Sequence, residues 1–366
     1  MKYREILEKN KINIKEIGSV NDFFRKPKEL FNAQKRNVGI EDSVFEVLMN
    51  PIVRRGDGLL FQDTQNDYIE KMTSYIHKDR PIKIVFLGFP FKCHNPIETL
   101  RKTPDLGELG FLLRLLDINE TVKQVYPAGV SFNILLEGSS YADFFGANTG
   151  EVELFENQLK HFVKKLEAKY TINFTNFAAV CSKFPEFENI RYKEEVRIRQ
   201  FDKSDNQEVS GLIDVMTRSL PVLENIPISD LLQVYDHFKG KESTLNDYQK
   251  QLKEYLYLGA EDLAISYLAF QKAKNKLDVI PKSFPNQLYF STTTKPTRYS
   301  FHPIHRKTRM FPHHGVPLLT TDKIDVCYLK DVLQNPEIYS AVFCKDDIED
   351  APFYYLKGKQ YIKKSL

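Results

Sequence analysis

A continuously apolar run, IKIVFLGFPFK at residues 82–92, constrains the fold of this 366-residue chain more than any other stretch. Its β-branched residues, and its end at Gly88 and Pro90, are typical of a strand that is buried on both faces of a sheet. The segment PDLGELGFLLRLLD follows, where Asp105 and Glu108, three residues apart, predict a capped helix start. A buried strand followed by a loop and a helix indicates an α/β fold with a largely parallel sheet.

The alternation of strands and helices continues along the chain. Residues 130–146 predict a strand, a turn at Gly138 and a second short extended or turn element, and residues 152–168 have the apolar spacing of a helix. Residues 246–276 predict a long helix with a potential break at Gly259, and the runs KIDVCYL and YSAVFC predict two late strands.

These patterns predict a Rossmann-like α/β fold, with a largely parallel sheet flanked by helices and a smaller helical subdomain. Residues 1–80 would form an N-terminal helical segment packed on the core. Residues 81–170 and 281–366 would form the first and second parts of the α/β core. Residues 171–280 would form the mainly helical subdomain.

The charge and the cysteine content exclude several classes of protein. The 52 basic and 49 acidic side chains leave a net charge of +3, too little to attract nucleic acid over the whole surface. The four cysteines show no CxxC spacing and are typical of reduced thiols rather than of a secreted disulfide scaffold. No apolar run has the length of a signal peptide or a membrane helix. We therefore expect a cytoplasmic protein that binds neither nucleic acid nor membranes.

Half of the chain's eight histidines lie in one short stretch, FHPIHRKTRMFPHHG. It contains His302, His305, His313 and His314, together with Arg306, Lys307 and Arg309. The three nearby cations would oppose a metal dication, and one short patch is a weak nucleic-acid surface. A pocket for a small phosphorylated or carboxylated substrate fits better, because arginine binds such anions and histidine transfers protons near neutral pH. Histidines with no chemical function remain the alternative.

A second candidate region follows the predicted strand. Ligands of open α/β sheets bind beyond the carboxyl ends of strands, where Lys92 and Asn95 lie. A solvated loop lysine is the alternative for Lys92, and capping alone would account for Asp105 and Glu108.

Two further acids, Glu137 and Asp143, flank the predicted turn at Gly138, where acids are also common for local hydrogen bonding. The chain has no GxGxxG after a strand and no Walker A, GxSxG or HExxH motif, so dinucleotide, NTP, serine-hydrolase and zincin functions lack their usual support.

Four segments together resemble the isocyanide (isonitrile) synthase family, which is related to the pyoverdine/paerucumarin and dityrosine biosynthesis proteins. They are FPFKCHNPIETLRKTPDLGELGFLLRL, YPAGVSFNILLEGSSYADFFG, SFPNQLYFSTTTKPTRYSFHP and FPHHG. They occur in order between about residues 80 and 320, and the block PFK-x-x-NP followed by PD-x-GE is the most specific.

The resemblance implies a reaction between the amine of an aromatic L-amino acid and ribulose 5-phosphate, whose C2 becomes the isonitrile carbon of a secondary metabolite. Tyrosine is the first expected substrate and tryptophan the second, with no metal or organic cofactor. A downstream iron- and oxoglutarate-dependent oxygenase would modify the product. A dityrosine-type enzyme with an N-formyl product, and a non-catalytic module that binds an anionic metabolite, are the alternatives.

The resemblance also implies site residues. Lys92 matches the family's PFK, Arg298 and His302 match R-x-S-x-HP, and His314 matches the histidine of P-W-H. Lys92 and Arg298 would hold the phosphate and the carboxylate in an unassigned order, while His302 and His314 would transfer protons. Glu108 is a further candidate catalytic residue, and the other candidate substrate-binding residues are Asn95, Asp105, Glu137, Asp143 and His313.

This sequence departs from the family pattern beside the expected pocket. Cys93 and His94 follow Lys92, RYSFHP replaces RLSIHP, and His313 stands in the tryptophan position of P-W-H. These departures bear on which amino acid is bound.

Overall fold

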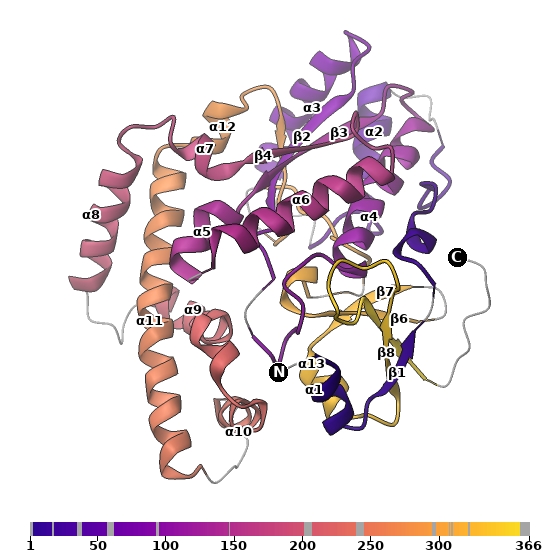
Figure 1. Ribbon diagram of the computed structural model, residues 1–366. Helices are drawn as coiled ribbons and strands as arrows, with labels where there is room; N and C mark the ends of the chain where they lie inside the picture. Colours follow the sequence, from indigo (N-terminus) through magenta and orange to yellow (C-terminus); the bar gives the residue numbers. More distant parts are fainter. Residues whose placement is uncertain are drawn as a thin grey trace.

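A four-stranded parallel sheet forms the centre of the fold (Figure 1). Its order is β4-β3-β2-β5, where β2 is Ile82–Gly88, β3 is Val130–Leu136, β4 is Ile172–Asn176 and β5 is Leu288–Tyr289. All three pairings are parallel, which confirms the predicted sheet and its first strand. The computed structural model describes residues 3–16, 18–34, 39–56, 62–92, 95–145, 147–200, 207–238, 245–294, 298–306, 308, 310–320 and 323–358.

Helix α4 (Leu106–Lys123) is buried on nearly all sides. The predicted capping box is confirmed: the Asp105 side chain accepts from Gly107 N at 2.7 Å, and the Glu108 side chain accepts from Asp105 N at 3.0 Å. The helix contacts β3 on one side and the second sheet on the other. A helix that is apolar around most of its circumference is typical of such a central position.

The second sheet has five strands in the order β1-β8-β9-β6-β7 and is mixed. Its strands are β1 (Asn13–Glu16), β6 (Val316–Leu319), β7 (Ile324–Cys327), β8 (Tyr339–Phe343) and β9 (Tyr354–Lys357). The two late strands predicted from KIDVCYL and YSAVFC are thus present. Segment 1–80 contributes β1 as well as helices, because β1 pairs with β8, a partner that local sequence does not reveal. Helices α1 (Tyr3–Lys9) and α13 (Leu329–Leu333) adjoin this sheet (Figure 1).

Short and medium helices surround the parallel sheet. They are α2 (Ile40–Met49), α3 (Gln62–Ile76), α5 (Gly138–Phe145), α6 (Thr149–Lys165), α7 (Phe177–Cys181) and α12 (Val279–Ser283). Four 3-10 turns are also described, namely η1 (Val20–Phe23), η3 (Thr217–Ser219), η4 (Pro221–Asn225) and η5 (Pro312–His314). The prediction of an extended or turn element after Gly138 was wrong, because α5 occupies this stretch. Tyr141 N donates to Glu137 O at 3.1 Å to begin the helix, and the Tyr141 ring packs on Phe270.

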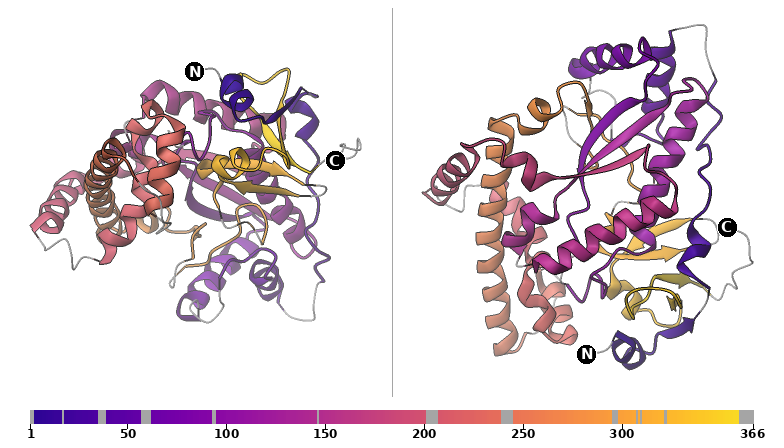
Figure 2. Two further views of the ribbon diagram at one scale, coloured as in Figure 1. Left: turned by 90° about the horizontal axis from the view of Figure 1, so that it is seen from below. Right: turned by 45° about the horizontal axis from the view of Figure 1, so that its top comes forward.

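Four helices form a unit with a core of its own beside the sheet. They are α8 (Phe187–Gln200), α9 (Gln207–Met216), α10 (Ile228–Phe238) and α11 (Asp247–Lys276), and they lie within residues 171–280, although β4 of that stretch belongs to the parallel sheet. Residues 281–366 contribute β5 to the parallel sheet and β6, β7, β8 and β9 to the second sheet. Helix α11 continues through Gly259, where a Cβ would lie 3.4 Å from the Leu220 side chain. Figure 2 shows this unit and the second sheet as separate lobes beside the parallel sheet. No described helix has both the length and the apolarity to cross a membrane.

Candidate active site

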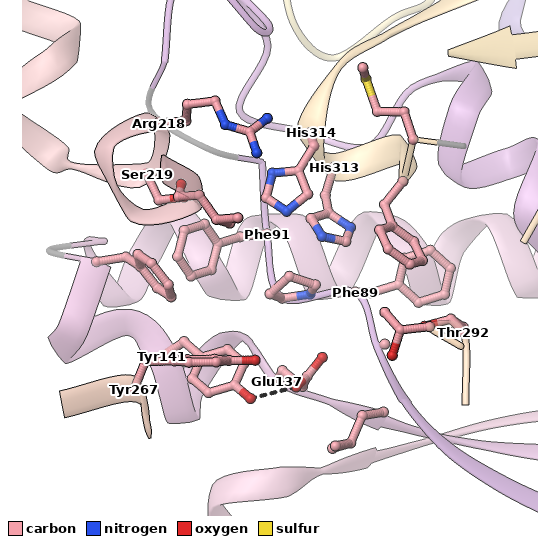
Figure 3. Close-up of a pocket in the computed structure, with 18 of the residues that line it drawn as sticks. Phe89, Phe91, Glu137, Tyr141, Arg218, Ser219, Tyr267, Thr292, His313 and His314 are labelled. Atoms are coloured by element: carbon pink, nitrogen blue, oxygen red, sulfur yellow. Dashed lines mark hydrogen bonds between the residues drawn. The ribbon is translucent and has the colours of Figure 1, made fainter. Parts of the chain in front are cut away.

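A cavity of about 450 Å³ lies beyond the carboxyl end of β2 (Figure 3). Residues 87–91 form one wall, and Met216, Arg218 and Tyr267 of the helical unit form another. This position is the usual ligand site of an open α/β sheet. Aromatic side chains dominate the lining, namely Phe89, Phe91, Phe111, Tyr141, Phe145, Tyr267, Phe311 and Tyr328. The size and lining suit a small, partly aromatic ligand.

Two histidines reach this cavity from η5, a turn that begins at Pro312. The His313 ring stacks on Phe311 with the ring centroids 5.5 Å apart, and it lies 4.3 Å from the His314 ring. Burial lowers the pKa of His313 well below its ordinary value, and the charges of His314 and Lys92 lower it further. His313 is therefore a neutral imidazole at neutral pH, while it forms part of the cavity wall.

A buried carboxylate stands behind His314. Glu98 is 1% exposed, and its Oε2 lies 3.6 Å from His314 Nδ1. Its other oxygen, Oε1, accepts a hydrogen bond from Arg218 Nη1 at 3.2 Å, and Arg218 also donates to the Tyr328 hydroxyl at 2.5 Å. Glu98 Oε2 accepts no hydrogen bond among the described residues, so the carboxylate acts on the imidazole through its charge, which favours a protonated ring. Arg218 is the single arginine or lysine among the described residues that line the cavity.

A second carboxylate faces the histidines from the opposite side of the cavity (Figure 3). Glu137 follows β3 and accepts a hydrogen bond from the Tyr141 hydroxyl at 2.6 Å, and Tyr141 accepts one from Gln271 at 2.9 Å. Burial raises the pKa of Glu137, although the bond from Tyr141 and the charge of Lys274 lower it. Glu137 can therefore retain a proton at a higher pH than an ordinary carboxyl group.

Lys92, Asp105 and Glu108, here called the lysine cluster, meet behind the cavity and do not line it. Lys92 Nζ lies 2.9 Å from Asp105 Oδ2 and 3.0 Å from Glu108 Oε2, and it donates to the Pro312 carbonyl at 2.9 Å. Burial lowers the pKa of Lys92, but the two acids outweigh burial and raise it above its ordinary value. Burial also raises the pKa of Asp105 well above its ordinary value, against the effect of Lys92. The cluster thus joins the start of α4 to the histidine turn.

Other sequence-predicted residues also lie outside the cavity lining. Asn95 is buried, and its side chain donates to the Arg218 carbonyl at 2.9 Å. The Arg298 guanidinium lies 4.1 Å from the Tyr289 ring centroid and donates to the Tyr289 hydroxyl at 2.9 Å. His302 is buried beside arginines. Asp143 belongs to α5, but its side chain lies outside the described residues, as do Cys93 and His94.

Sequence reasoning thus placed Glu137, His313 and His314 in one site and missed most of their neighbours. Glu98 lies inside the quoted block NPIETLRK, three residues after Asn95, so its position in that block was an available signal. Arg218 comes from a stretch with no recognisable motif, and Tyr267 comes from the predicted long helix, where nothing marked it as a site residue.

The site can hold an aromatic ligand against a cation and move protons between imidazole and carboxyl groups. The family model for the pyoverdine/dityrosine biosynthesis protein matches residues 72–335, well over half of the chain. This chain therefore belongs to that family, which confirms the resemblance seen in the sequence.

Among proteins similar to this chain is the L-tryptophan isonitrile synthase AmbI1 of Fischerella ambigua, 25% identical over 101 residues, or 28% of this chain and 32% of that protein. The spore wall maturation protein DIT1 of Saccharomyces cerevisiae is 24% identical over 99 residues, or 27% of this chain and 18% of that protein. The matched segments thus span about a third or less of these relatives.

The crystal structure of the PvcA protein from Pseudomonas aeruginosa has the same fold. It superposes with a TM-score of 0.59 at 17% identity, over 87% of this chain and 100% of that one. Among the described residues, no group of three or more His, Cys, Asp or Glu side chains is arranged to hold a metal ion.

Proposed function

We propose that this protein is an isonitrile synthase that converts the amino group of an aromatic L-amino acid, tyrosine first and tryptophan second, to an isonitrile. Ribulose 5-phosphate would supply the carbon without a metal or organic cofactor. The cavity carries the proposal, because it combines an aromatic wall with two histidines that face a half-buried carboxyl group. The family match and the tryptophan isonitrile synthases among the similar proteins support it.

The first chemical step would join the amine to the C2 ketone of the sugar. The amine loses protons, the ketone oxygen leaves as water, and an imine forms, so the site must both accept and donate protons. His314, whose Nδ1 lies 3.6 Å from Glu98 Oε2, is suited to accept the amine proton. Glu137, whose pKa is raised chiefly by burial, is suited to supply a proton to the departing oxygen. Arg218 would bind the amino acid carboxylate, a role that the sequence had led us to expect of Lys92 or Arg298.

The product class is open to a second candidate. Similarity to the yeast spore wall maturation protein favours a dityrosine-type enzyme whose product is an N-formyl amino acid. Either product retains the C2 carbon of the sugar, so one labelling experiment separates them. If the product is an isonitrile, an iron- and oxoglutarate-dependent oxygenase is the expected downstream enzyme.

The test uses ribulose 5-phosphate carrying carbon-13 at C2, incubated with the purified protein and each aromatic amino acid in turn. Label in an isonitrile carbon, detected by NMR and mass spectrometry, is the expected result, and label in a formamide would favour the dityrosine-type reaction. If folded protein transfers no label to any aromatic amino acid, both reactions are rejected. If such a protein binds a ligand without consuming it, the non-catalytic binding module is supported instead.

A further inference from the structure

Three basic side chains from distant parts of the sequence meet behind one wall of the cavity. Arg55, Arg114 and His302 are here called the arginine cluster. His302 N donates to the Val53 carbonyl at 2.9 Å, and the Arg114 guanidinium donates to the carbonyl of Ile52. The loop that precedes Arg55 is therefore held by both of the other members, which brings the three side chains into one region.

Two members of the arginine cluster have buried polar atoms that lack partners. His302 is 8% exposed and Arg114 is 6% exposed. Neither Nδ1 of His302 nor Nε of Arg114 has a hydrogen-bond partner among the described residues. Native proteins leave few buried polar atoms unsatisfied, and a missing ligand is one physical reason for such a pair.

The arginine cluster also buries positive charge. Burial lowers the pKa of His302 to about 4, and Arg114, Arg55 and the exposed Arg306 lower it further. Burial likewise lowers the pKa of Arg114 to about 10, although Asp117 raises it. That acid is itself engaged by Arg25, whose Nη2 lies 2.6 Å from Asp117 Oδ2. An anion bound here would stabilise the buried Arg114 guanidinium, whose acidic neighbour is shared with Arg25.

The arginine cluster adjoins the cavity along a shared wall. Arg55 Nη1 donates to the Thr292 carbonyl at 2.9 Å, and its guanidinium carbon lies 5.5 Å from the Phe311 ring centroid. Thr292 and Phe311 both line the cavity, as does Phe111, which lies one helical turn before Arg114 on α4. A ligand held against Thr292 and Phe311 would therefore lie next to Arg55, while Arg114 and His302 lie behind that wall.

We propose that the arginine cluster binds the phosphate group of the sugar phosphate, while Arg218 binds the carboxylate of the amino acid. The inference rests on the proposed function, since it assigns one substrate of that reaction to its place. Guanidinium groups suit this ligand because they present paired donors to phosphate oxygens. In this arrangement the phosphate and the carboxylate would bind at separate places, and the ketone carbon of the sugar would lie toward the histidines.

The test compares Arg55→Ala and Arg55→Lys with the wild type and with Arg80→Ala. Arg80 is exposed and precedes β2 at the opposite end of the sheet, so its loss makes the same charge change far from the cavity. We expect Arg55→Ala to raise the KM for ribulose 5-phosphate about tenfold or more, because a charge-assisted hydrogen bond is lost. The KM for the amino acid should stay within about twofold, Arg55→Lys should recover part of the loss, and Arg80→Ala should match the wild type.

Calorimetry with inorganic phosphate separates failure of this inference from failure of the proposed function. If the wild type transfers no label from ribulose 5-phosphate, the function fails, yet phosphate binding that is lost in Arg55→Ala still supports the arginine cluster. An unchanged KM for ribulose 5-phosphate, an equal rise for both substrates, or a wild type that binds no phosphate overturns it. If Arg55→Ala does not fold, Arg55→Lys and Arg114→Lys supply the same comparison.

Discussion

Helix α4 carries two buried charged clusters of opposite design. At its start, the lysine cluster places Lys92 Nζ 2.9 and 3.0 Å from two carboxylate oxygens. Further along the helix, Arg114 joins Arg55 and His302, and all three are basic. Glu108 Oε1 lacks a hydrogen-bond partner among the described residues, but Lys92 lies against both acids and balances one of their two charges. A cluster of opposite charges is suited to hold the fold together, and a cluster whose buried polar atoms lack partners is suited to bind a ligand.

Breaking the lysine cluster should have the largest effect. In Lys92→Met, two acids would remain buried without their cation, so we expect a loss of about 3–5 kcal/mol in the free energy of unfolding. Denaturant unfolding of this variant and of Lys83→Met, an exposed control on β2, measures it. A change below about 1 kcal/mol would mean that the cluster does not stabilise the fold. Because of this expected loss, reduced activity of a Lys92 variant is not by itself a sign of catalysis.

The carboxylate behind His314 provides the next test. Glu98→Gln keeps the shape of the side chain but removes its charge, so His314 loses the charge that favours its protonated form. We expect kcat to fall about a hundredfold, the size of effect that misplacing a catalytic group can have. The KM for the amino acid should also change, because Glu98 accepts a hydrogen bond from Arg218, whereas the KM for ribulose 5-phosphate should change little. Steady-state kinetics, with each substrate varied in turn, measures kcat and both KM values. If Glu98→Gln lowers kcat by the same factor in a His314→Gln background as in the wild type, the two residues act independently.

The arginine cluster should respond differently from the lysine cluster. Arg114→Met removes a buried charged side chain whose Nε has no hydrogen-bond partner among the described residues. The substitution also removes the hydrogen bond to the Ile52 carbonyl. We expect the free energy of unfolding to change by about 1 kcal/mol or less, while phosphate binding weakens. Denaturant unfolding and phosphate calorimetry on the same preparation measure both. A loss as large as that of Lys92→Met would contradict the contrast between the clusters.

The last expected effect is a dependence of stability on pH. The pKa of His302 is 6.5 before folding and about 4 in the folded protein, so between these values the unfolded chain binds more protons. Stability should therefore fall as the pH drops from about 6.5 to about 4. His302→Gln should remove part of this slope in urea unfolding across that range, with the remainder due to groups such as His313. A slope identical to that of the wild type would show that His302 does not contribute.

The parts of the fold set by local patterns could be predicted from the sequence. The apolar run of β2 and the Asp105–Glu108 capping box act over a few residues, and both appeared where expected. The pairing of β1 with β8 could not be seen, because it joins Asn13 to Ser340 and neither strand alone specifies its partner.

The same division applies to the site. His313, His314 and Glu137 all line the cavity, and each was marked by a local feature, the histidines by their shared stretch and Glu137 by the predicted turn at Gly138. Lys92 also follows a strand end, but the carbonyl of Pro312 and the two acids enclose it, and their approach depends on tertiary packing. Arg218 enters from a helical unit whose packing on the sheet no local pattern encodes.

The bond from Lys92 to the Pro312 carbonyl joins residues 220 positions apart. Contacts of such long sequence separation form slowly, because a large loop must close before they contribute. The histidine turn therefore reaches its place only after the two sheets have assembled around α4. During refolding, helical structure should return before the ability to turn over substrate, so we expect activity to be regained late in folding.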